Sequence, residues 1–386
     1  MSGRRQRLIQ RRKTLGFSQE ELAHALGVER STVVRWESGE REPRPWHRPK
    51  LAAVLRVSLE DVDAYLACQA DERPEAERLA RALAEPAAVD LVTAAHRAER
   101  VQHLTAEYDS SPSTSLIADA GRCHSQVALL RASAPNRRIR RELCTSAAES
   151  ATLMGRLVWD ASQRRDHAVP VRYFDQAIDA AREAGDPMLE AHAQLRKGFV
   201  ALYGTKNVRE GLRLCEETVT AGRSPGNVLT GLGLLHVGEA YAMLGERRDC
   251  EKALGAAEDT LARLGRDDEA RHLFSPSQFG RLAGSCYLFL GLNDKAERIL
   301  AASARQPVRG KKSQAIVLGN LALARLRQGR AEEACGPLHE AIDLIEATRG
   351  GGGFNIAFTA GRELSPWRHE RWAQEVGDRL FCLMAA

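Results

Sequence analysis

One predicted helix carries side chains that could read the bases of DNA. Arg35 follows Arg30 by five residues and Ser31 by four, so the three project from the same side of a helix that begins after Val28 and ends at Gly39. An arginine can hydrogen-bond the O6 and N7 atoms of one guanine together, and a serine can contact a base or a phosphate. The residue types and their spacing therefore indicate a helix that could contact DNA.

A second predicted helix lies just before it and would hold it in place. Ser18 is followed three residues later by Glu21, which is the capping-box pattern of a helix start. Gly27 supplies the turn to the next helix. Two short helices joined by so tight a turn need a small residue where they touch, and Ala23 meets that need. The residues expected to be buried between the helices are Leu22, Ala23, Leu26, Val33 and Trp36.

This arrangement resembles a known DNA-binding family. The match runs from Gln19 to Gly39 and continues through Arg41-Glu-Pro-Arg44, and it is similar to the helix-turn-helix of the xenobiotic-response-element (XRE) family, whose fold is lambda-repressor-like. The resemblance covers the chain from Arg4 to about Leu66. It implies five helices, near residues 4–15, 18–26, 29–37, 46–55 and 59–66.

The resemblance also implies which residues contact DNA and which hold the domain together. The base contacts would come from Arg30, Ser31 and Arg35, and the phosphate contacts from Gln19, Arg41 and Arg44. Arg12 and Glu37 would form a structural pair that joins the first helix to the third. The family usually has Ser or Thr at position 29, whereas this chain has Glu29, so we expect a weaker cap on the third helix.

The rest of the chain repeats a helical pattern. A small residue is followed, after a turn, by another small residue about twelve positions on, as expected for two helices that cross closely and then stack on the next pair. The clearest cases are Gly238 before Cys250 and Leu254, and Gly284 before Ala296 and Leu300. This pattern resembles a tetratricopeptide-type array with long units. A DNA-binding head joined to such an array resembles actinomycete regulators and, more distantly, the RRNPP regulators.

These features predict an all-α chain in three parts. A helix-turn-helix domain would span 1–68, a helical linker with the first helices of the next domain would span 69–144, and the repeats with a C-terminal capping helix would span 145–386. Stacked helix pairs curve around a concave groove. The polar residues expected to line that groove are Gln194, Arg196, His236 and Asn320.

The function that follows is a transcriptional regulator. We expect a cytoplasmic homodimer that binds an inverted repeat in double-stranded DNA and senses a peptide, a small molecule or a protein partner in the groove. The alternative is an adaptor or antitoxin-like partner that DNA binding only localises. No nucleophile-base-acid set, metal-ligand spacing or phosphate loop can be argued, so we expect no enzyme activity, cofactor, metal or membrane segment. The four glycines from Gly350 to Gly353 are interpreted as a flexible connection.

The distribution of charge supports a DNA-binding N-terminus. Residues 1–50 hold 12 Lys and Arg against 6 Asp and Glu, whereas the remaining 336 residues hold 44 against 45. The net charge of +5 therefore belongs to one end of the chain. Half of the 12 basic residues lie in the first predicted helix, namely Arg4, Arg5, Arg7, Arg11, Arg12 and Lys13.

Overall fold

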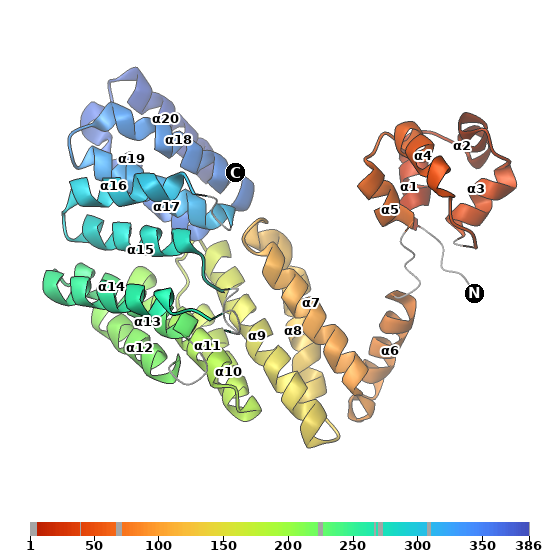
Figure 1. The fold of residues 1–386 in the computed structure, drawn as a ribbon, viewed down its shortest axis with the longest axis horizontal. Helices are drawn as coiled ribbons and strands as arrows, with labels where there is room; N and C mark the ends of the chain where they lie inside the picture. The colour runs from red at the N-terminus through yellow and green to blue at the C-terminus, as the bar shows by residue number, and fades with distance from the viewer. Residues whose placement is uncertain are drawn as a thin grey trace. The chain divides into compact units, whose positions relative to one another are not determined.

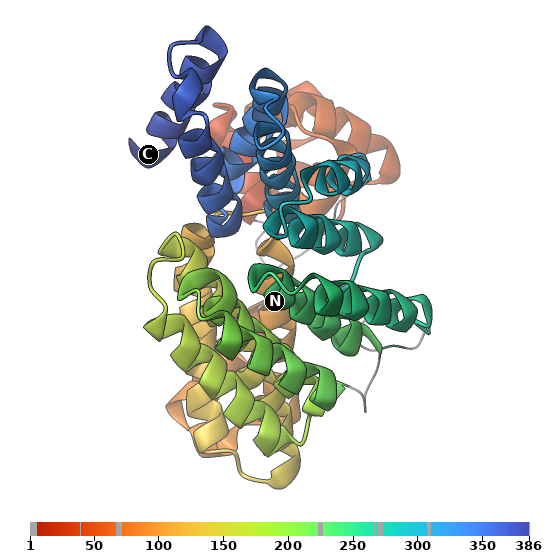
Figure 2. The ribbon, with the colours of Figure 1, turned by 90° about the vertical axis from the view of Figure 1, so that its left-hand side faces the viewer.

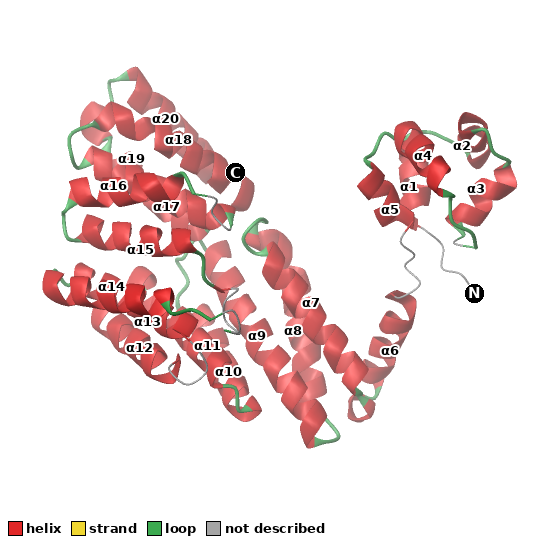
Figure 3. Ribbon diagram, in the orientation of Figure 1, coloured by secondary structure: helices red, strands yellow, loops and turns green. Residues whose placement is uncertain are grey.

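The chain folds into helices that form two separate compact units. The computed structural model describes residues 6–38, 40–66, 72–222, 227–265, 268, 273–306 and 310–385. Within these ranges every regular element is a helix, which confirms the predicted all-α fold class (Figure 3). The two units are Met1–Glu85 and Pro86–Ala386 (Figure 1). No helix in the described ranges has the length and apolar character needed to cross a membrane.

The first unit contains the five helices that the resemblance implied. Each begins and ends within two residues of the expected position. The helices of the unit are α1 (Gln6–Thr14), α2 (Gln19–Leu26), α3 (Arg30–Glu37), α4 (Arg48–Leu55), α5 (Leu59–Leu66) and α6 (Glu72–Ala84), with a 3-10 turn, η1 (Pro45–His47). Its core is built from buried apolar residues of α1 to α5, including Leu8, Leu22, Ala23, Leu26, Val33, Trp36, Leu51, Leu55 and Val62.

Local signals explain how α2 and α3 meet. The Glu21 N–H donates to Ser18 Oγ (3.1 Å) and the Ser18 N–H donates to the Glu21 carboxylate (2.6 Å), so the predicted capping box is present. Gly27 ends α2 with a φ of 70°, a left-handed conformation that a glycine adopts without strain. Gly39, the residue expected to end α3, lies outside the described residues.

The second unit is a succession of helices that lie side by side (Figures 1 and 2). They are α7 (Leu91–Glu107), α8 (Ser113–Ala132), α9 (Arg137–Ala161), α10 (Ala168–Ala184), α11 (Pro187–Phe199), α12 (Val208–Gly222), α13 (Asn227–Met243), α14 (Arg247–Ala262), α15 (Pro276–Phe289), α16 (Asn293–Ala304), α17 (Lys311–Leu326), α18 (Ala331–Thr348), α19 (Gly351–Glu363) and α20 (Arg371–Ala385). The shorter elements are η2 (Pro86–Ala88), η3 (Val200–Gly204) and η5 (Ser365–Trp367). The expected boundary between residues 144 and 145 falls inside α9. This one helix packs on both α8 and α10, so it belongs to both of the predicted parts.

Small residues lie where the paired helices cross, as the repeat pattern predicted. A Cβ atom placed on Gly238 of α13 would contact the Leu254 side chain of α14 at 3.4 Å. A Cβ on Gly284 of α15 would come within 2.5 Å of Leu300 Cγ on α16. The second distance is too short for any real side chain, so the α15 and α16 crossing requires a glycine.

Replacing Gly284 with alanine should therefore destabilise the second unit. The added methyl group overlaps Leu300, and overpacking of this kind costs about 1–3 kcal/mol. The same change at Gly255 is the control, because Gly255 is exposed on α14 and its Cβ would meet nothing within 4 Å. Removing that helical glycine should stabilise by about 0.5–1 kcal/mol. Thermal unfolding of both variants checks the prediction, and equal midpoints would contradict it.

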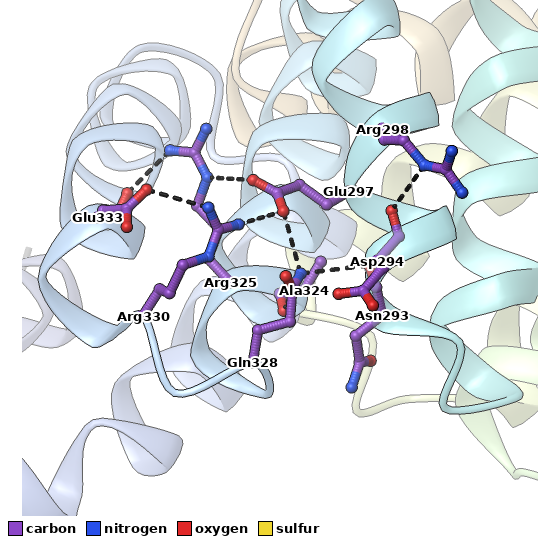
Figure 4. Close-up of polar contacts among 9 residues, drawn as sticks. All are labelled: Asn293, Asp294, Glu297, Arg298, Ala324, Arg325, Gln328, Arg330 and Glu333. Atoms are coloured by element: carbon purple, nitrogen blue, oxygen red, sulfur yellow. Dashed lines mark hydrogen bonds and ion pairs between the residues drawn. The ribbon is translucent and has the colours of Figure 1, made fainter.

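The helix pairs are also joined by polar contacts, and those of Glu297 are one such set (Figure 4). Glu297 of α16 accepts hydrogen bonds from Arg325 Nε (3.0 Å), from Gln328 Nε2 (3.1 Å) and from Arg330. Burial raises the pKa of Glu297, but the bonds from Arg330 and Arg325 outweigh burial and hold that pKa below its ordinary value. This carboxylate ties α16 to α17 and to the turn that leads into α18.

The Glu297→Ala substitution should lower the free energy of unfolding by about 1–3 kcal/mol, because a mostly buried acceptor with charged donors is removed. Glu375→Ala is the matched control. Its carboxylate is 54% exposed and pairs with Arg371 on the surface of α20, so its loss should cost less than about 1 kcal/mol. Urea unfolding of the two variants measures the difference, and similar losses would show that Glu297 has no special role.

The inner helices of the second unit close into a ring. Each of α9, α11, α13, α15 and α17 contacts the next member of this series, α17 contacts α19, and α19 contacts α9. At the closure, Asn355 Nδ2 donates to the backbone oxygen of Gln163 (3.4 Å). Each helix with an even number from α10 to α18 packs on the inner helix that precedes it in the chain. The inner layer can therefore enclose a space.

The glycine run at this closure is not a flexible connection, and that interpretation is wrong. Gly350 to Gly353 are buried, and the last three form the first turn of α19. A Cβ at Gly352 would come within 2.7 Å of Arg164 Nη2, and one at Gly353 within 2.8 Å of Ala315 Cβ. Gly353 is needed because α19 passes so close to Ala315 of α17, whereas the neighbour of Gly352 is the movable end of an arginine side chain.

Candidate functional sites

The first candidate site is the exposed face of α3. Arg30, Ser31 and Arg35 are all exposed, whereas Val33 and Trp36 face the core. Arg35 Nε lies 4.0 Å from the carboxylate of Glu40, and both side chains reach solvent. The structure thus places the three predicted base-contact residues together on one accessible helix face.

The start of α3 differs from a strongly capped helix, as expected. Glu29 is the N-cap residue, and its side chain makes no capping hydrogen bond. Its carboxylate instead accepts from the Ser31 hydroxyl (3.2 Å). A carboxylate therefore stands beside a predicted base-contact residue, and Ser31 must leave it to donate to DNA.

Arg12 and Glu37 form a buried ion pair that joins α1 to α3. Arg12 Nε donates to Glu37 Oε1 (2.6 Å) and Arg12 Nη2 donates to Glu37 Oε2 (3.2 Å). A third donor is Gln19 Nε2, at 2.7 Å from Glu37 Oε2. Gln19, expected to contact a phosphate, is therefore also part of the support of α3. Gln19 can both donate to Glu37 and contact a phosphate, because its side-chain amide has a second N–H.

Two of the basic residues of α1 make contacts within the unit, so fewer of them are available to contact DNA. Arg11 donates to the backbone oxygens of Leu55 (3.0 Å) and Arg56 (2.9 Å), and Arg12 is paired with Glu37. These two side chains stabilise the fold of the unit. The residues about which the structure gives no side-chain information are Arg4, Arg5 and Arg7.

The loop after α3 carries the remaining predicted phosphate contacts and one residue that the sequence did not single out. Arg41 and Arg44 are exposed. The Arg44 guanidinium lies 5.2 Å from the centre of the Trp46 ring, and Trp46 is 60% exposed. Trp46 is therefore an exposed aromatic residue beside one of the predicted phosphate contacts.

The second candidate site is a cavity of about 2000 Å³ in the second unit, lined mainly by the inner helices and partly open to solvent. Ten Arg and Lys residues and four Asp and Glu residues line it. The sequence expectation for the groove was correct at Arg196, His236 and Asn320, which all line this cavity. Gln194 is not among the lining residues, and its amide donates to Glu217 on α12.

Two buried carboxylates of the cavity wall are balanced by neighbours. Asp160 of α9 accepts from the Tyr108 hydroxyl (2.6 Å) and forms ion pairs with Lys312 (3.4 Å) and Arg164 (3.5 Å). Glu239 accepts from Ser285 (2.6 Å) and from Tyr203, which also bonds His236 Nδ1 (2.8 Å). Burial lowers the pKa of His236, so this histidine is neutral near pH 7.

A third carboxylate of the wall is about half protonated near neutral pH. Burial raises the pKa of Glu149 to about 7, with a smaller contribution from the charge of Asp186. The cavity therefore holds an excess of positive charge, although the residues beyond position 50 are almost neutral as a whole. The sequence did not reveal this excess, because arginine is abundant throughout the chain and its local pattern does not show which side chains face inward.

Comparison with known proteins gives one clear match. Residues 8–62 match the family model described as helix-turn-helix. None of the curated proteins matches the chain. Among solved structures, the chain is similar to the crystal structure of Bacillus thuringiensis PlcR in complex with the peptide PapR7 and DNA, at 11% sequence identity and a TM-score of 0.29. That alignment covers 77% of this chain and 94% of the other, and a TM-score of this size is too low to establish a shared fold.

The family match lies within the first unit. It covers α2, Gly27 and α3, the buried core and the exposed arginines of α3. A helix-turn-helix presents its second helix to the major groove of DNA. Residues 8–62 are therefore a helix-turn-helix domain of the XRE type, and the chain is a DNA-binding transcriptional regulator.

Proposed function

We propose that this regulator binds an inverted repeat as a homodimer and changes its DNA binding when a ligand occupies the cavity of the second unit. The observation that carries the proposal is the pairing of two separate units, one with an exposed recognition helix and the other with a large internal cavity. The protein would act in the cytoplasm, where its operator lies.

The size of the cavity favours an extended ligand. Pockets for drug-sized molecules usually measure about 300–1,000 Å³. A cavity of about 2000 Å³ can take a short peptide or a larger small molecule. Such a ligand regulates only if it binds one arrangement of the dimer more tightly than the other, since equal affinity produces no switching.

The experiment begins with selection of operators. The full chain is incubated with a pool of random duplex DNA, and the bound duplexes are sequenced. We expect one enriched inverted repeat whose half-sites lie about 10–10.5 bp apart, or a multiple of that spacing. Failure to enrich any sequence would contradict a role as a sequence-specific regulator.

The second step tests sensing. The operator complex is titrated with peptide and small-molecule fractions of a native extract, and the apparent Kd for DNA is measured. A fraction that shifts the Kd supports sensing. A stoichiometric protein partner, found together with no effect of any small fraction, would instead establish the alternative role as an adaptor or antitoxin-like partner.

A further inference from the structure

Three arginines of the cavity wall lack a counter-ion. Arg156 lies on α9, Arg196 on α11 and Arg281 on α15, and all three line the same cavity. Within the described part of the chain, none of them forms an ion pair with a carboxylate. The buried Nε atoms of Arg156 and Arg281 also have no hydrogen-bond partner there. The three side chains are partly buried, and polar groups removed from water normally have a partner, so this group needs an explanation.

The charges of Arg156 and Arg281 both act on Arg196. Burial, then the charge of Arg156 and to a smaller extent that of Arg281, lower the pKa of Arg196 to about 9. Tyr108 and Asp109 oppose this effect without neutralising it. Arg196 therefore remains protonated at pH 7, but it is held close to other cations in a site that water solvates poorly. An anion placed among the three would relieve this repulsion.

The same cavity wall shows that the fold can neutralise a cation where it needs to. Lys312 and Arg164 share the carboxylate of Asp160, and Lys312 Nζ also donates to Ser113 Oγ (2.8 Å). These contacts join α8, α9 and α17 and so have a structural role. In the described residues no carboxylate lies within ion-pair distance of Arg156, Arg196 or Arg281; Asp160 and Asp109 act on Arg156 and Arg196 only from farther away.

Neighbouring rings hold two of the arginines in position. The Arg156 guanidinium lies over the Tyr108 ring at 3.7 Å from its centre. The Arg196 guanidinium lies 5.2 Å from the centre of the Phe199 ring, and its Nε donates to His192 (3.2 Å). Stacked guanidinium groups have fewer orientations to lose on binding a ligand, and their N–H forks match the oxygens of carboxylates and phosphates.

We propose that Arg156, Arg196 and Arg281 form a binding site for an anionic group, a carboxylate or a phosphate, of the ligand that occupies the cavity. This inference rests on the proposed function for the identity of the cavity as a ligand site. It adds the chemical class of the ligand: a molecule with an acidic group that enters this cluster and a remaining part that fills the rest of the cavity.

The experiment uses the full chain and two simple probes, sodium phosphate and sodium citrate, each added at an ionic strength kept constant with sodium chloride. Thermal unfolding is followed for the wild-type protein and for Arg196→Gln and Arg281→Gln. The control is Arg371→Gln, because Arg371 is 91% exposed on α20. We expect a saturable rise of the wild-type and control midpoints with phosphate or citrate. Comparison of the two probes shows which oxyanion the site prefers.

The two cavity variants should weaken the apparent affinity for the probe by at least about tenfold, since hydrogen bonds to a charged group are removed. Their unfolding midpoints without probe should equal or exceed that of the wild type, because an unpaired buried cation is lost. Equal probe responses in all four proteins would overturn the proposal. A fall in the midpoint of the probe-free variants, with an unchanged probe response, would assign the arginines a structural role and would also overturn it.

Operator binding separates this inference from the proposed function. If a native ligand still shifts the Kd for DNA in Arg196→Gln as in the wild type, the arginine site is refuted while sensing stands. If both probes bind the wild type through the arginines and no ligand shifts the Kd for DNA, the anion site stands while sensing is refuted.

Discussion

Replacing Arg30 and Arg35 together with alanine should abolish most sequence-specific DNA binding. Both side chains are exposed on α3, the helix that a helix-turn-helix places in the major groove. Each lost base contact costs about 1–3 kcal/mol, so the double variant should bind its operator roughly 30-fold to 10⁴-fold more weakly. The measurement is the Kd of the full chain for the selected operator and for scrambled DNA at one salt concentration.

Which of the two DNAs loses affinity is more informative than how much affinity is lost. Specific binding should approach the affinity for scrambled DNA, because the phosphate contacts remain. Arg44→Ala should instead weaken binding to both DNAs about equally. The slope of log Kd against log salt concentration should fall by about one, because one phosphate contact is lost. Arg247→Ala, an exposed residue of α14 in the second unit, is the control and should change neither. A double variant that still selects the same operator from a random pool would show that α3 is not the reading helix.

The Glu37→Ala substitution should unfold the first unit before it changes sequence preference. Glu37 is 3% exposed and accepts three hydrogen bonds, two from Arg12 and one from Gln19. Its removal leaves the buried guanidinium of Arg12 without a counter-ion, and a broken buried pair commonly costs about 3–5 kcal/mol. That loss is comparable with the whole stability of a small domain.

Hydrogen exchange in the full chain measures this effect within the first unit. The amides of α1 to α3 should lose protection in Glu37→Ala, whereas those of the second unit should not change. Glu40→Ala is the matched control, because Glu40 is mostly exposed and lies 4.0 Å from Arg35. The double replacement Arg12→Met with Glu37→Leu should restore much of the protection, since it removes both charges. Unaltered protection in Glu37→Ala would mean that the pair contributes little.

The helix-turn-helix could be predicted from the sequence because its determinants are local. The capping box of Ser18 and Glu21, the left-handed Gly27 and the buried positions of α2 and α3 all lie within about twenty consecutive residues. Hydrogen bonds and helical periodicity over so short a distance are almost independent of the rest of the fold. The contact between Gly284 and Leu300 was predictable for a similar reason, because the two helices follow each other along the chain.

The cavity could be predicted only in part. Arg196 and Gln194 are two residues apart on α11 and look equivalent in the sequence, yet Arg196 lines the cavity and Gln194 bonds Glu217 on α12. Arg156 and Arg281 were not singled out at all, because they come from helices more than a hundred residues apart. Which side of each helix faces inward depends on how the ring closes, and this depends on contacts between α9 and α19.

The sequence by itself determined the all-α class, the helix-turn-helix with its exposed arginines, and the helix pairs with small residues at their crossings, since each is set by neighbouring residues and by helical spacing. Only the tertiary structure decided that Gly350 to Gly353 are buried at a close approach of helices, that Asp160 is shared by two cations, and that three arginines without an acid meet in one cavity. The physical reason is distance along the chain. Packing and electrostatic contacts between remote segments leave no periodic pattern in the sequence, but they place the charges that a ligand would meet.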